Sequence, residues 1–323
     1  MSQVSSREFQ SNWFYSFWKF SRPHTIIGTS LSVLGLYLIA VAVSEFPAET
    51  LRDGQSAAFG DRTYSLFPLL GAWVACLCGN IYIVGLNQLE DVAIDKINKP
   101  HLPVAAGEFS LTTGKLIVGI TGVLALVVAW LQGPFLLGMV AISLAIGTAY
   151  SLPPIRLKRF PFWAAVCIFS VRGAIVNLGL FLHYSWVFEH SSSITPAVWV
   201  LTVFVLVFTF AIAIFKDVPD MEGDLLYNIK TLTLQIGKQA VFNLALWVIT
   251  VCYLGMIGVG LLRLAEVNSI FLVVTHLVAL VLMWWRSRQV DLQEKSEIAR
   301  FYQFIWKLFF LEYLVFPIAC LLA

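Results

Sequence analysis

Uncharged stretches long enough to cross a lipid bilayer recur along the whole chain. The longest lies between Lys115 and Arg156, which enclose forty residues without a charged side chain. A helix needs about 20 residues to cross the apolar core of a bilayer, so this stretch predicts two helices joined by a tight turn at residues 132–134. Because 59% of the residues are hydrophobic and the mean hydropathy is +0.82, the sequence predicts an integral membrane protein.

The hydrophobic pattern predicts nine membrane-spanning helices within one domain, residues 1–323. Helices satisfy all their backbone hydrogen bonds internally, as lipid requires, so an all-α membrane protein is expected. Residues 1–24 precede the first span and carry aromatic residues at helical spacing, which predicts an amphipathic segment along the membrane interface. The predicted spans are residues 25–43, 68–89, 114–131, 135–150, 162–182, 196–215, 240–262, 267–285 and 303–322.

Lysine and arginine are divided unequally between the two sets of connecting segments. Of the 21 Lys and Arg residues, 16 fall on the side of the amino terminus, whereas the opposite loops hold only Arg52, Arg62 and Arg263. The positive-inside rule therefore predicts a cytoplasmic amino terminus. The net charge of +2 is too small to predict nucleic-acid binding. The sequence leaves the oligomeric state open.

Two acidic clusters lie at predicted cytoplasmic ends of spans. NQLEDVAID carries an Asn and two Asp at positions i, i+4 and i+8, and KDVPDMEGD carries three Asp at i, i+3 and i+7. On a helix, either spacing keeps the side chains on one face. Their oxygens suit Mg²⁺, which binds a few carboxylates together with substrate phosphates. The two clusters therefore predict a Mg²⁺ site that holds a diphosphate. The six predicted metal ligands are Asn87, Asp91, Asp95, Asp217, Asp220 and Asp224.

Each acidic run has a simpler explanation on its own, because helix ends exposed to water commonly carry carboxylates. Two runs on one side, in a chain with only 12% charged residues, favour a functional site. An ion-coupled transporter is another possible class, but it would place acidic residues near span centres, which are apolar here. Pro219 splits the second run and predicts that the sixth span ends or kinks there.

Basic side chains near the clusters predict contacts with a diphosphate. Arginine suits bidentate contacts to phosphate and lysine supplies a compact charge. The positive-inside rule alone also explains the cations that follow Pro153 and Pro154. Arg172 differs because it interrupts a span, which predicts that it lines a cavity. The candidate substrate-binding residues are Arg156, Lys158, Arg172, Lys216 and Arg22.

The two acidic motifs resemble those of the UbiA superfamily of membrane-embedded aromatic prenyltransferases. NQLEDVAID matches the pattern NxxxDxxxD, KDVPDMEGD matches the second Asp-rich motif, and YSLPPIRLKR lies between them. The resemblance covers nearly the whole chain. It implies nine helices around a central cavity, a Mg²⁺-bound prenyl diphosphate, and attack by an electron-rich aromatic ring on an allylic cation. The residues it implies to be catalytic are Asp91, Asp95, Asp220 and Asp224.

Within the superfamily, FWKFSRPHTIIGT, DKINKPHLPVAAGEFS and KDVPDMEGD look most like the homogentisate prenyltransferases, in particular the cyanobacterial phytyltransferases of tocopherol synthesis. That resemblance implies phytyl transfer to homogentisate with loss of its carboxyl group, in a cyanobacterial plasma or thylakoid membrane. A basic residue such as Arg172 or Arg22 would hold the acceptor carboxylate. Chlorophyllide or another quinone precursor is the alternative acceptor, although chlorophyll synthases typically carry Arg where this chain has Leu102.

Overall fold

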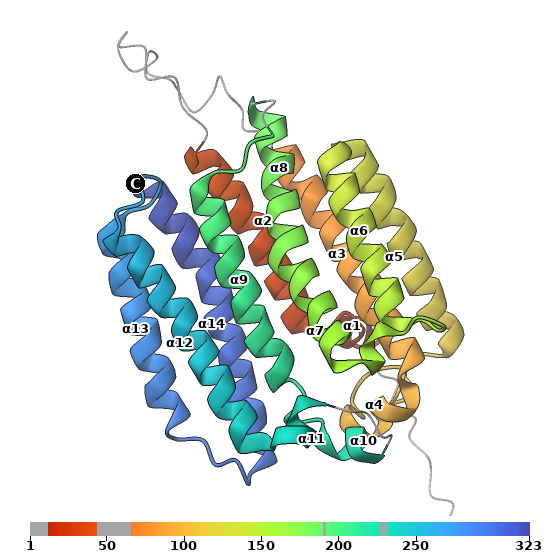
Figure 1. The fold of residues 1–323 in the computed structure, drawn as a ribbon. Coiled ribbons are helices and arrows are strands. Elements are labelled where there is room, and N and C mark those ends of the chain that lie inside the picture. Colours follow the sequence, from red (N-terminus) through yellow and green to blue (C-terminus); the bar gives the residue numbers. More distant parts are fainter. Residues whose placement is uncertain (1–11, 44–65, 190–191, 227–230) are drawn as a thin grey trace, which may run out of the picture.

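A computed structural model describes residues 12–43, 66–189, 192–226 and 231–323, and within these ranges every regular element is helical (Figure 1). Residues 1–11 of the predicted interfacial segment and residues 44–65 between the first two spans lie outside the described ranges. The elements, including the 3₁₀ turn η2 and the π-helical segment η3, are α1 (Trp13–Phe20), α2 (Pro23–Val43), α3 (Leu66–Glu90), α4 (Val92–Asn98), α5 (Leu111–Gln132), α6 (Pro134–Ser151), η2 (Leu157–Arg159), α7 (Pro161–Phe169), η3 (Ser170–Ile175), α8 (Val176–Glu189), α9 (Pro196–Phe215), α10 (Met221–Leu226), α11 (Leu232–Ile236), α12 (Lys238–Leu261), α13 (Ser269–Ser287) and α14 (Lys295–Leu321).

Nine helical segments of the described chain are long and apolar enough to cross a membrane. They are α2, α3, α5, α6, the continuous run from α7 through η3 to α8, α9, α12, α13 and α14. The predicted all-α membrane fold with nine spans is therefore confirmed. Large apolar side chains such as Trp130, Val203 and Ile270 are exposed on the outside of the bundle, as expected where lipid tails replace a protein neighbour.

The forty-residue uncharged stretch forms the expected hairpin. Helix α5 ends at Gln132, and Gly133 has φ 127°, a backbone conformation that glycine adopts without a steric penalty. Pro134 then opens α6, a position where its missing amide hydrogen costs nothing. Both helices pack against α3. The predicted turn at residues 132–134 is confirmed.

The fifth span contains a local change of helix type. It was expected over residues 162–182, but the helical run extends to Glu189 and includes the π-helical segment η3. Gly173 in η3 lies against α9, since a Cβ atom there would come within 2.6 Å of the Cα atom of Leu206. Short π-helical segments often mark functional positions. Arg172 belongs to this segment.

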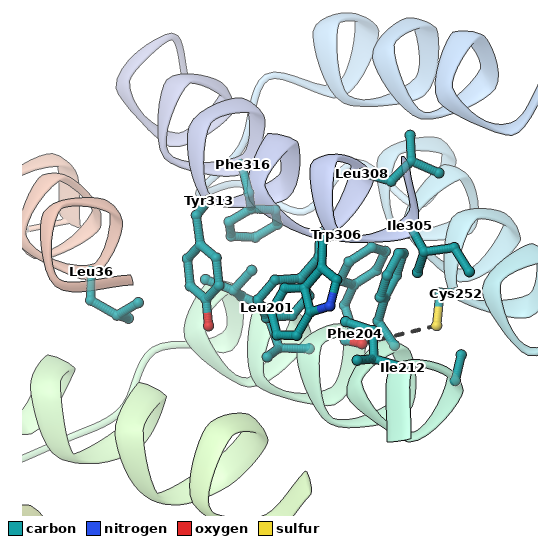
Figure 2. Close-up of a cluster of buried hydrophobic side chains, with 14 of the residues drawn as sticks. Leu36, Leu201, Phe204, Ile212, Cys252, Ile305, Trp306, Leu308, Tyr313 and Phe316 are labelled. Carbon is teal, nitrogen blue, oxygen red and sulfur yellow. Dashed lines mark hydrogen bonds between the residues drawn. The ribbon is translucent and has the colours of Figure 1, made fainter. Parts of the chain in front are cut away.

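The core is centred on α9 and α14. Helix α9 is the most buried span, and its Leu201 and Phe204 face Trp306 and Tyr313 of α14 (Figure 2). The largest fully buried side chains include several more aromatics of α14. This aromatic packing fixes α14 against α9, and α9 leads directly into the second acidic motif.

Short helices gather at one end of the bundle. Helices α4, α10 and α11 lie together there, whereas the carboxyl terminus lies at the opposite end (Figure 1). Helix α4 packs against α10. Segments that follow the second and sixth spans are thereby brought side by side, and these are the two segments that carry the acidic motifs.

Candidate active site

The first acidic motif is split between two helices. Helix α3 ends at Glu90, α4 begins at Val92, and Asp91 between them has φ −112° and ψ 19°. The prediction of one continuous helical face is therefore wrong. Asn87 and Asp91 nevertheless remain in contact, because Asn87 Nδ2 donates to Asp91 Oδ2 at 3.1 Å. The amide of Asp95 also donates to the carbonyl of Asp91 at 2.8 Å, which keeps the third residue of the motif close.

Three cations converge on the first motif. Arg156 Nη2 donates to Asp91 Oδ1 at 3.0 Å, and Lys158 Nζ lies 2.7 Å from Asp91 Oδ2. Arg22 Nη2 donates to Asn87 Oδ1 at 3.3 Å. Burial lowers the pKa of Lys158, an effect that the adjacent Asp91 carboxylate opposes. The structure therefore brings three of the predicted substrate-binding residues to the predicted metal ligands.

Two of these arginines have an unusual backbone conformation. Arg22 has φ 53° and Arg156 has φ 41°, both in the left-handed region. Such a conformation costs a residue other than glycine about 1–3 kcal/mol and persists where surrounding contacts fix it. Arg22 lies in the corner between α1 and α2, and Arg156 immediately precedes η2. The two guanidinium groups are thus held by turns at the end of the bundle where the acidic motifs lie.

The second acidic motif lies in a turn followed by a short helix. Helix α9 ends at Phe215, the next residues form a turn, and α10 begins at Met221. The prediction of a helical face over residues 217–224 is therefore wrong. The sixth span ends at Phe215, which matches its predicted bounds of 196–215, and the helix is interrupted around Pro219. Pro219 disfavours helical geometry at Val218, and the Val218 amide donates instead to the carbonyl of Phe215 at 3.0 Å.

An ion pair joins the two motifs. Lys99, just after α4, donates through Nζ to Asp220 Oδ2. Lys99 is not among the candidate residues predicted from the sequence, because nothing in the sequence shows that α4 faces α10. Lys216 lies on the other side of the second motif, where its Nζ is 3.9 Å from Asp217 Oδ1 and donates to the Tyr150 hydroxyl at 3.4 Å.

Three carboxyl groups of the site have pKa values above the usual carboxyl value. Asp95 is buried, its Oδ2 has no hydrogen-bond partner, and burial raises its pKa to about 6. Burial, followed by repulsion from Asp217 and Asp220, raises the pKa of Asp224 to about 7. Burial also raises the pKa of Asp217. Hard oxygen donors that are crowded, buried and short of positive charge fit a divalent cation such as Mg²⁺.

Two other carboxylates of the site form ion pairs with lysine and arginine side chains of the protein. Asp91 is paired with Arg156 and Lys158, and Asp220 is paired with Lys99. Among the described residues, no three His, Cys, Asp or Glu side chains are grouped closely enough to hold a metal ion as they stand. Metal binding would therefore require the carboxylates to exchange partners.

Arg172 lies apart from this cluster. It sits within the fifth span, where its guanidinium carbon is 5.4 Å from the Trp306 ring centroid and 5.8 Å from that of Phe309. Both rings belong to α14. The six acidic-motif residues and the four other basic candidates thus lie at one end of the bundle, with Arg172 deeper inside it.

Comparison with known proteins identifies the family. The family model described as the UbiA prenyltransferase family matches residues 56–308. The chain belongs to this family. It is 57% identical over 304 residues to a homogentisate phytyltransferase of Synechocystis sp., covering 94% of this chain and 95% of that protein. It is 40% identical to homogentisate phytyltransferase 1 of Arabidopsis thaliana, covering 94% of this chain and 74% of that protein.

Solved structures of UbiA homologues share the fold. A UbiA homologue from Archaeoglobus fulgidus bound to GPP and Mg²⁺ matches with a TM-score of 0.61 at 15% identity, covering 95% of this chain and all of that one. The apo structure of a UbiA homologue from Aeropyrum pernix K1 matches with a TM-score of 0.64 at 16% identity, covering 93% of this chain and 98% of that one. The nine-span bundle is therefore the UbiA fold.

Proposed function

We propose that residues 1–323 form one enzyme domain that transfers a phytyl group from phytyl diphosphate to homogentisate, with loss of the homogentisate carboxyl group, in tocopherol biosynthesis. The observation that carries the proposal is the similarity over nearly the whole chain to proteins named homogentisate phytyltransferases. The arrangement of the site is consistent with it, because two acidic motifs and several cations meet at the mouth of an apolar bundle.

The acidic motifs bind the metal in this proposal. Bound Mg²⁺ would neutralise the charge that develops on the departing diphosphate. Carboxylate ligands from both halves of the chain would hold the diphosphate in one orientation. The proposed metal ligands are Asn87, Asp91, Asp95, Asp217, Asp220 and Asp224, of which Asp91, Asp95, Asp220 and Asp224 are the proposed catalytic residues.

The basic residues around the motifs bind the diphosphate oxygens. Lys158 in η2 and Arg156 just before it both contact Asp91. Arg22 contacts Asn87, and Lys216 lies beside Asp217. Arginine contributes paired hydrogen bonds and lysine a compact charge. Phosphate oxygens would replace the carboxylate partners that these cations have in the structure.

Aromatic side chains deeper in the bundle would exclude water from the reacting carbon. Trp306, Phe309 and Phe310 form a continuous group of rings on α14, with centroids 5.7–6.3 Å apart. The faces of such rings attract cations, and their packing removes water that would quench an allylic cation. The same group of rings contacts Arg172.

Acceptor identity can be tested directly. Purified protein with Mg²⁺ is expected to transfer phytyl to homogentisate and to transfer little to 4-hydroxybenzoate or chlorophyllide, as measured by product analysis. Parallel reactions with geranylgeranyl diphosphate establish the preferred tail. A preference for chlorophyllide would refute the homogentisate assignment and leave the metal chemistry unaffected.

The proposed orientation puts the active site on the cytoplasmic side of a cyanobacterial membrane. In a background without cysteine, single cysteines at Asn98 and Leu157 are expected to react with a membrane-impermeant thiol reagent from the cytoplasmic face only. A cysteine at Leu262, which is exposed at the end of α12, is expected to react from the opposite face only. Labelling of Asn98 and Leu262 from the same face would overturn the orientation.

A further inference from the structure

Arg172 places a cation in the middle of a membrane span. It lies ten residues after Phe162, the first residue of that span, which is about 15 Å along a helix. The apolar core of a bilayer is about 30 Å thick, so the arginine lies near mid-depth. A charged side chain at that depth is costly and needs a partner or a function.

Three lysines near the acidic motifs lie close to carboxylates, and Arg172 does not. Lys99 pairs with Asp220, Lys158 pairs with Asp91, and Lys216 lies near Asp217. In the described part of the chain, no carboxylate forms an ion pair with Arg172. Its neighbours include the rings of Trp306 and Phe309 and the α2 residue Gly28. Stacking on a ring engages the face of a guanidinium group and leaves its N–H edge for a planar anion.

The guanidinium group faces α2 a short distance beyond the diphosphate site. A Cβ atom at Gly28 would come within 3.0 Å of Arg172 Nη1. Gly28 follows Arg22 by six residues, which is about 9 Å along a helix, and Arg22 donates to Asn87 in the first acidic motif. His24 lies between them, with its ring 5.1 Å from that of Trp306. Arg172 is therefore set back from the metal-binding motifs, at the inner end of an aromatic-lined region.

We propose that Arg172 is the residue that binds the carboxylate of the aromatic acceptor, and that this contact restricts the site to small aromatic acids. This inference rests on the proposed function. It distinguishes Arg172 from Arg22, which is already hydrogen-bonded to a proposed metal ligand. A bidentate arginine–carboxylate contact away from water is strong and fixes the orientation of a planar acid. The acceptor ring would thereby be held between Arg172 and the diphosphate.

The test compares an acid with its neutral ester. Homogentisate and homogentisate methyl ester are titrated into wild-type and Arg172→Lys protein, and binding is followed by tryptophan fluorescence alongside steady-state kinetics. The Kd and KM for homogentisate are expected to rise by about tenfold to a hundredfold, the range for a hydrogen bond to a charged group. The Kd for the ester and the KM for phytyl diphosphate are expected to stay within about twofold of wild type. Arg300→Lys, on the exposed surface of α14, is the matched control and is expected to change none of these constants.

Each outcome separates the assignment of Arg172 from the proposed function. Wild-type protein that neither binds nor prenylates homogentisate would refute the proposed function. If the wild-type protein is active and Arg172→Lys leaves the homogentisate Kd unchanged, the role of Arg172 is refuted and the proposed function is not. A rise in the KM for phytyl diphosphate alone in Arg172→Lys would have the same meaning. Should Arg172→Lys fail to fold, Arg172→Gln, which removes the charge and keeps a polar side chain, tests the same contact. An unchanged homogentisate Kd in a folded Arg172→Gln protein would also refute the assignment.

Discussion

Removing divalent metal with excess EDTA is expected to abolish phytyl transfer, and added Mg²⁺ is expected to restore it. The two acidic motifs contribute six oxygen donors, and burial raises the pKa of both Asp95 and Asp224. Without a metal, diphosphate would have to leave with its charge neutralised only by the side chains around it. Loss of Lewis-acid assistance worth several kcal/mol lowers the rate by about a thousandfold or more. Product formation measured before and after chelation checks this, and full turnover in EDTA would contradict the metal site.

The same experiment has a pH dependence with a defined sign. The pKa values of about 6 for Asp95 and about 7 for Asp224 lie above the usual carboxyl value. Carboxyl groups must lose their protons to bind metal, so protons compete with Mg²⁺ as the pH falls through this range. The Mg²⁺ concentration that gives half-maximal rate is therefore expected to rise as the pH falls from 8 to 6. A half-maximal Mg²⁺ concentration that stays constant between pH 6 and pH 8 would argue against Asp95 and Asp224 as metal ligands.

Asp91→Asn and Asp220→Asn are each expected to lower kcat by about a thousandfold. Asparagine keeps the shape of the side chain and removes its charge, so the measured loss reports on metal and diphosphate binding. Asp291→Asn is the matched control, because Asp291 is exposed in the loop between α13 and α14. That loop lies at the same end of the bundle as α10 and α11 (Figure 1). Unchanged circular dichroism and thermal unfolding would show that the variants retain the fold.

Combining the two substitutions tests whether the motifs act together. Residues that act as one unit give losses that do not add. If both motifs bind one metal–diphosphate complex, the double variant is expected to be little worse than either single variant. Near-normal turnover in one single variant would instead show that its motif is a solvent-exposed acidic segment without a role in metal binding.

The spans could be predicted from the sequence because membrane insertion depends on local composition. The α5–α6 hairpin is an example, since its length and its Gly133–Pro134 turn are both visible in the sequence. The break at Asp91 was not predictable in this way. Its partners Arg156 and Lys158 follow it by more than sixty residues. The backbone at Asp91 therefore occurs together with ion pairs between distant parts of the chain, and the spacing of residues within one motif gives no information about such pairs.

The sequence predicted which residues form the candidate site, but it did not predict their backbone conformation or which side chains pair with each other. Both acidic motifs meet at one end of the bundle, yet neither forms the helical face that its spacing indicates. The pair formed by Lys99 and Asp220 depends on the packing of α4 against α10, which is visible only in three dimensions. The assignment of metal and substrate roles to these residues stays a prediction until the variants are measured.

The ion pairs at the mouth of the bundle have a consequence for how substrate is loaded. Asp91 and Asp220 are each neutralised by cations of the protein itself. If the proposed site is right, a bound metal–diphosphate complex would supply a cation for these carboxylates and an anion for the lysines and arginine that leave them. Loading would then be an exchange of counter-ions in which no unpaired charge is exposed beside the lipid. Release of pyrophosphate would reverse that exchange, and the protein's own ion pairs would re-form.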